Sequence, residues 1–72
     1  MALFEDGDVK SAIEIFRRAI EIDPSDKEMY FGLGGALKED GDVDGAIENY
    51  RKVIELDPRF YEAYSNLSCL SL

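Results

Sequence analysis

The 72-residue chain contains no histidine, which removes the side chain that most often serves as a general base or a metal ligand. Its single cysteine, Cys69, has no second thiol for an internal disulfide and no histidine to activate it. The acidic run 40–45 resembles the opening of a calcium loop, but Arg51 stands where that loop needs a bidentate glutamate. We therefore expect no enzymatic activity, no cofactor and no metal site.

Basic residues are also scarce, with 8 Lys and Arg against 16 Asp and Glu, for a net charge of −8. Such a surface repels phosphate backbones and anionic membranes, so we expect neither nucleic acid nor membrane as a partner. A basic protein or peptide is favoured, mainly through its rate of association. No apolar run reaches membrane-spanning length, and residues 1–6 do not read as a signal peptide, so the cytoplasm is the expected location.

What the sequence does contain is a repeat. Gly7-Asp8-Val9 returns 34 residues later as Gly41-Asp42-Val43, and residues 1–24 are identical to residues 35–58 at 15 of 24 positions. A fixed period of this length is typical of stacked supersecondary units. The repeat therefore favours a binding or scaffolding role over catalysis.

Hydrophobic periodicity predicts four helices and no strand, because apolar residues recur at steps of three and four. The predicted helices cover residues 8–22, 26–39, 42–56 and 59–71. Asp8 and Asp42 are the expected N-caps of the first and third helices, and Ser25 forms a predicted capping box with Glu28 at the second. Each of the two prolines follows the end of a predicted helix and prevents its continuation.

The second predicted helix is unusually rich in glycine. Gly41 is placed to end it in left-handed geometry. Gly34 is explained by close packing against a partner helix, which requires a small residue. Gly32 and Gly35 have no such explanation and indicate either a locally weak helix or a backbone opened to a ligand, because each glycine costs about 1 kcal/mol relative to alanine.

Together these features resemble the tetratricopeptide repeat family, in which each unit is a pair of antiparallel helices, A and B. Residues 27–60 match a complete unit through Tyr30, Leu33-Gly34, Leu37, Ala46, Tyr50, Val53 (where the family usually has alanine) and Pro58. Residues 1–26 match the later part of a unit, and residues 61–72 match the opening, with helix A only. The resemblance implies one all-α domain over residues 1–72, with helix-turn-helix repeats stacked as a short right-handed α-solenoid.

The resemblance also implies a protein-interaction module that binds a peptide or helix of a partner in a groove lined by A helices. The candidate groove residues are Glu28, Phe31, Gly35, Lys38, Glu39, Glu62, Ser65, Asn66 and Cys69. Phe31 stands out, because a large apolar residue there has no reason within the helix. We predict that Phe31→Ala weakens partner binding more than it weakens the fold.

A structural role is the alternative. Residues 60–72 carry a single charge, Glu62, and their apolar side chains are candidates for self-association: Tyr61, Tyr64, Leu67, Leu70 and Leu72. Two uncapped ends would bury each other, either as a closed homodimer or as an open head-to-tail oligomer. The sequence does not separate this alternative from a third one, an excised or engineered piece of a longer array.

Overall fold

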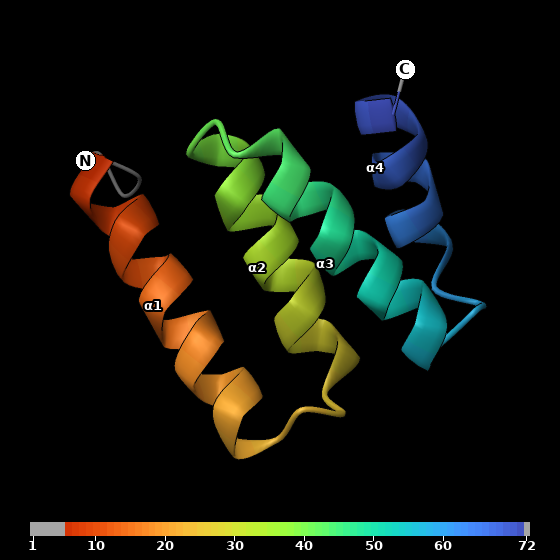
Figure 1. Ribbon diagram of the computed structural model, residues 1–72, viewed down its shortest axis with the longest axis horizontal. Coiled ribbons are helices and arrows are strands. Elements are labelled where there is room, and N and C mark those ends of the chain that lie inside the picture. Colours follow the sequence, from red (N-terminus) through yellow and green to blue (C-terminus); the bar gives the residue numbers. More distant parts are fainter. Residues whose placement is uncertain (1–5, 72) are drawn as a thin grey trace.

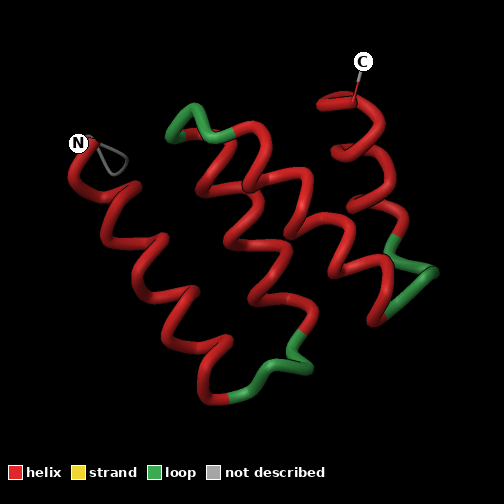
Figure 2. The backbone as a smooth tube through the Cα atoms, in the orientation of Figure 1, coloured by secondary structure: helices red, strands yellow, loops and turns green. Residues whose placement is uncertain are grey.

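The computed structural model describes residues 6–71, which form four helices joined by short turns (Figures 1 and 2). The helices are α1 (Asp6–Ile22), α2 (Lys27–Glu39), α3 (Val43–Leu56) and α4 (Tyr61–Ser71). Consecutive helices run in opposite directions, and each packs against the next one in the chain (Figure 1). The predicted all-α fold of stacked helix pairs is confirmed. None of the described helices is both long and apolar enough to cross a membrane.

The turn between α2 and α3 forms as predicted. Gly41 has a φ of +91°, in the left-handed region. Its N–H donates to the carbonyl of Lys38 (3.1 Å), and the N–H of Asp42 donates to that of Leu37 (2.8 Å). The Asp42 carboxylate then accepts from the N–H of Gly45 (3.0 Å) and caps α3. One glycine and one aspartate thus end a helix and start the next.

The same two residue types do not make a turn at positions 7 and 8, so the prediction that Asp8 is an N-cap is wrong. Both residues are helical, within α1. The Gly41 turn depends on carbonyls of the helix that precedes it, which the local Gly-Asp pair does not supply. Inside the first described turn of α1, the Asp8 carboxylate instead complements the positive end of the helix dipole. The sequence suggests that residues 1–6 end another helix, but Asp6 is the first residue of α1, and residues 1–5 lie outside the described residues.

The predicted capping box at Ser25 and Glu28 is also wrong. Asp26 is the N-cap of α2, and its carboxylate accepts from the N–H of Glu28 (3.1 Å). Ser25 turns the other way, donating its N–H (3.2 Å) and its hydroxyl (2.8 Å) to Oδ1 of Asp23. A charged carboxylate at a helix N-terminus is a stronger acceptor than a hydroxyl, so Asp26 takes the cap position.

The core lies mainly where α2 packs against α3, and its buried side chains are Ile13, Leu33, Leu37, Ala46, Tyr50, Val53 and Ala63. Gly34 makes this packing close, because a Cβ there would lie 2.8 Å from the ring of Tyr50. The predicted packing role of Gly34 is confirmed.

Gly32 has the same kind of role toward α1, so the hypothesis that it weakens α2 or opens its backbone is wrong. A Cβ at Gly32 would lie 2.6 Å from the Phe16 ring, and α2 is helical throughout Lys27–Glu39. At Gly35 the nearest atom to such a Cβ is the Tyr50 hydroxyl oxygen, at 3.8 Å. Close packing therefore explains two of the three glycines, and Gly35 leaves space.

Candidate functional site

The candidate residues that the sequence assigns to A helices lie on α2 and α4, and Tyr50 of α3 lies at the junction between these helices. A Cβ placed at Gly35 on α2 would lie 3.8 Å from the Tyr50 hydroxyl oxygen. Burial raises the pKa of Tyr50, and the side chain of Asn66 on α4 lowers it by less. The phenol is therefore neutral at physiological pH and offers a polar group between the two helices.

Phe31 extends this junction toward the turn before α4. Its ring centroid lies 5.7 Å from that of Tyr50 and 4.9 Å from that of Phe60, both in tilted arrangements. Phe31 is half-buried and packs against the core. Its role in partner binding stays a prediction, and these contacts give the ring a part in packing as well.

The other candidates on α2 and α4 are mostly exposed, and three of them are acidic. Exposed side chains include Glu28, Lys38, Glu39, Glu62, Ser65 and Cys69. Glu28 and Glu62 occupy equivalent positions, 34 residues apart, on helices that run in the same direction (Figure 1). Among these candidates three carboxylates stand against one ammonium group, and Glu62 also shares a surface pocket with the cations Lys27 and Arg59.

An ion pair ties the turn before α4 to the start of α2. Lys27 Nζ lies 2.7 Å from Oδ2 of Asp57. This hydrogen bond raises the pKa of Lys27 and lowers the pKa of Asp57, and the backbone N–H of Arg59 (3.1 Å) lowers the latter further. The pair therefore joins the first residue of α2 to the C-cap of α3.

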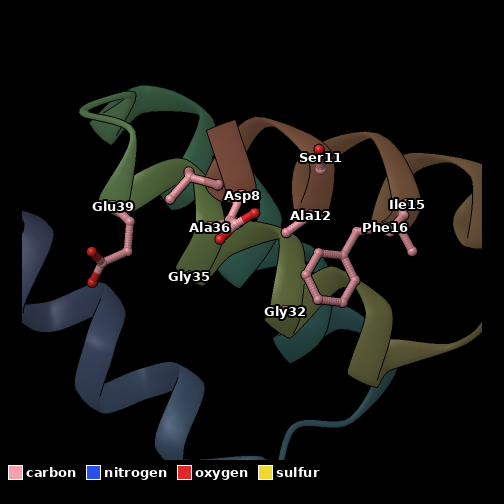
Figure 3. A pocket seen from close by; sticks show the side chains of 10 residues that line it. Asp8, Ser11, Ala12, Ile15, Phe16, Gly32, Gly35, Ala36 and Glu39 are labelled. Atoms are coloured by element: carbon pink, nitrogen blue, oxygen red, sulfur yellow. The ribbon is translucent and has the colours of Figure 1, made fainter. Parts of the chain in front are cut away.

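A second feature, which the sequence did not indicate, is an open apolar groove of about 470 Å³ between α1 and α2 (Figure 3). Its lining residues are Asp8, Val9, Ser11, Ala12, Ile15, Phe16, Gly32, Gly35, Ala36 and Glu39. Two predicted site residues, Gly35 and Glu39, thus face this groove. Ile15 was the available signal, because an isoleucine that is 65% exposed stands where the other repeat has Asn49.

The predicted self-association residues divide into two groups. Tyr61 is 71% exposed and Tyr64 is 46% exposed, whereas Leu67 and Leu70 are half-buried against the core. Leu72 lies outside the described residues. The N-terminal half of α4 therefore presents two aromatic side chains to solvent.

The described helices are antiparallel and repeat at an offset of 34 residues, and glycines in α2 make room for aromatic rings of neighbouring helices. These features define a helical-repeat protein. The family model for the tetratricopeptide repeat matches residues 3–67, and the chain belongs to this family. Its repeats generally mediate protein–protein interactions and are typically not enzymatic. A comparison with curated proteins gives no match. Within the described residues, no three His, Cys, Asp or Glu side chains cluster so as to hold a metal ion.

Proposed function

We propose that this chain is an interaction module that holds a Lys- or Arg-containing segment of a partner protein against the face formed by α2 and α4. The observation that carries the proposal is the set of exposed acidic side chains on α2 and α4, which are Glu28, Glu39 and Glu62. The general role of the family supports a protein partner. The net charge of −8 adds a longer-range attraction for a basic segment.

The apolar part of the same face gives the segment a place to pack. The half-buried ring of Phe31 contacts the rings of Phe60 and Tyr50. The aliphatic stem of a lysine or arginine would pack against this aromatic cluster. Gly35 leaves the neighbouring surface free of a side chain. Charge would select the partner, and the aromatic cluster would add contact area.

The test compares two double variants that remove the same charge. Glu28→Gln/Glu62→Gln acts on the proposed face, and Glu14→Gln/Glu48→Gln acts on exposed residues of α1 and α3 that are also 34 residues apart. The probes are fluorescein-labelled extended peptides that differ only in carrying three lysines or three glutamates, read by anisotropy. Exposed charge pairs are worth about 0.2–1 kcal/mol each, so the first variant should bind the lysine peptides about two- to thirtyfold more weakly.

The control variant should lose much less affinity, and wild-type binding should weaken as salt is added. Equal losses in the two variants, or a preference for the glutamate peptides, would refute the proposed face. Phe31→Ala adds a further check: binding should fall more than thermal stability does. A collapse of the melting temperature would instead make Phe31 a core residue.

A second candidate function is self-association, and one observation favours it. Both terminal helices expose large apolar side chains, Ile15 and Ile22 on α1 and Tyr61 and Tyr64 on α4. Among the described helices, α1 and α4 each pack closely against one neighbour, whereas α2 and α3 each pack against two.

A further inference from the structure

The groove between α1 and α2 corresponds, at an offset of 34 residues, to the surface of α3 that α2 covers. The 34-residue offset maps α1 onto α3 and α2 onto α4. Within the unit 27–60, α2 packs on α3, leaving Ala46 0% and Tyr50 2% exposed. Their equivalents, Ala12 and Phe16, are only half-buried and line the groove. The groove is thus shaped for another helix of the α2 type.

Helix α4 carries much of the face that such a helix needs. Tyr64 and Leu67 stand where α2 has Tyr30 and Leu33, the residues near its contact with α3. Tyr64 is 46% exposed, so the described residues cover this face only in part. Helix α4 lies at the opposite end of the row of helices from α1, which forms one wall of the groove (Figure 1).

We propose that copies of this chain associate head to tail, with α4 of one copy packed in the α1–α2 groove of the next. The inference rests on the second candidate function, self-association, and assigns its two surfaces and their register. The interface is heterologous, and after one junction each complex still exposes one groove and one α4. The product is therefore an open chain of copies.

Two contacts of the complete unit predict contacts at the junction. Lys52 Nζ lies 6.0 Å from the centroid of the Tyr30 ring, so its equivalent Arg18 should lie over Tyr64 of the neighbouring copy. Lys27 bonds to Asp57, so Tyr61 of one copy should lie beside Asp23 of the next, where its hydroxyl is placed to donate. Both predicted contacts follow from the offset alone.

A second copy accounts for the exposed surfaces better than an unrelated helix would. One junction covers Ile15 of one copy and Tyr64 of another, whereas a foreign helix in the groove would leave α4 exposed. The fit is not perfect, since Ser68 replaces the glycine of α2 at position 34, where a Cβ would lie 2.8 Å from the Tyr50 ring. The ring at the junction is Phe16, which is half-buried and borders an open groove, so it has room to move.

The first experiment measures molar mass by light scattering from about 1 µM to about 1 mM, the range in which weak interfaces dissociate. The wild-type mass should rise from the 8.1 kDa of one chain as concentration increases. Ile15→Gln should weaken association about tenfold, because it removes apolar burial in the groove. Ile22→Gln is the matched control, since Ile22 is on the same helix and 85% exposed but does not line the groove, and it should have no effect.

Complementary variants test the register from the other side. Ser68→Gln places a bulky side chain on the face of α4 that enters the groove, and Glu62→Gln places the same residue on another exposed position of α4. Only the first should block association. A mixture of Ile15→Gln with Ser68→Gln contains one intact groove and one intact α4, so it should recover complexes of twice the single-chain mass. Circular dichroism confirms that each variant folds.

Salt gives an independent readout, because every copy carries a net charge of −8 and like-charged copies repel less as salt is added. Self-association should therefore strengthen with salt, while binding of a basic peptide should weaken. A wild-type mass that stays at 8.1 kDa throughout would overturn self-association itself. Association that ignores both Ile15→Gln and Ser68→Gln would overturn this junction alone, and the Glu28→Gln/Glu62→Gln variant still tests the peptide-binding face separately, because neither residue lines the groove.

Discussion

Alanine at Gly34 should destabilise the protein, whereas alanine at the next residue, Gly35, should stabilise it. Both residues lie in α2, where a glycine costs about 1 kcal/mol relative to alanine, so each replacement gains that amount in helix propensity. A Cβ at Gly34 would meet three atoms of the Tyr50 ring at 2.8–3.1 Å. Overpacking of a core costs about 1–3 kcal/mol, which exceeds the gain. A Cβ at Gly35 would have no neighbour closer than 3.8 Å, so the gain remains.

The Tyr50 ring has little freedom to relieve the contact. It is 2% exposed and is enclosed by α2, Phe31 and α4, so a shift would disturb several neighbours. We therefore expect a net loss of about 1 kcal/mol for Gly34→Ala and a gain of up to about 1 kcal/mol for Gly35→Ala. Gly32→Ala should fall between them, because the ring it would meet, that of Phe16, is half-buried beside an open groove.

The assay is reversible thermal and urea unfolding, followed by circular dichroism at low protein concentration so that association does not contribute. For a domain of this size, about 1 kcal/mol moves the melting temperature by about 4–8 °C, so the two variants should differ by roughly 10 °C. Shifts of the same sign and size would show that helix propensity alone decides these positions. The packing of Tyr50 against Gly34 would then not be the reason for the glycine.

Two further predictions concern the turns. Asp26→Ala should cost about 1 kcal/mol, since it removes the N-cap of α2, while Ser25→Ala should cost less, and urea unfolding compares them. Lys27 and Asp57 give a pH dependence. The pKa of Asp57 lies below its ordinary 3.8 and that of Lys27 above its ordinary 10.5. The pair therefore stabilises the fold between these values, and its effect is lost as pH falls through the lowered pKa of Asp57 or rises through the raised pKa of Lys27. The stability difference between wild type and Asp57→Asn should be level near neutrality and shrink at both extremes; a pH-independent difference would contradict this.

Local patterns in the sequence were sufficient for the helices, because each depends on its own apolar spacing and on the glycine, proline and aspartate at its ends. The caps were harder, since Ser25 and Asp26 are adjacent and only the geometry of the turn decides which one faces the helix. Gly32 could not be explained locally at all, because the ring that requires it comes from Phe16, on another helix. Sequence reasoning therefore failed where the cause lay in packing between helices.

The candidate site gives a second example in which packing between helices, and not the local sequence, decides the environment of a residue. Ala12 and Ala46 are the same residue in the same repeat position, yet one is half-buried and the other fully buried. Their environment depends on whether a further helix lies across them, which no local pattern records. The groove could have been found from the sequence only by asking what covers each position of the repeat and then noticing Ile15, apolar where its equivalent is Asn49.

This dependence on neighbours also separates the two proposed surfaces. The proposed face of α2 and α4 lies within one chain, so binding there needs no second copy and should depend on charge. The groove of α1 and α2 is apolar and is not covered by any of the described helices, so a helix that fills it gains burial of apolar surface. If both proposals hold, low salt favours capture of a basic segment and high salt favours the open chain of copies. Titrating salt at fixed protein and peptide concentrations should then move the two signals in opposite directions, and a common direction would require that one of the two surfaces has been assigned to the wrong ligand.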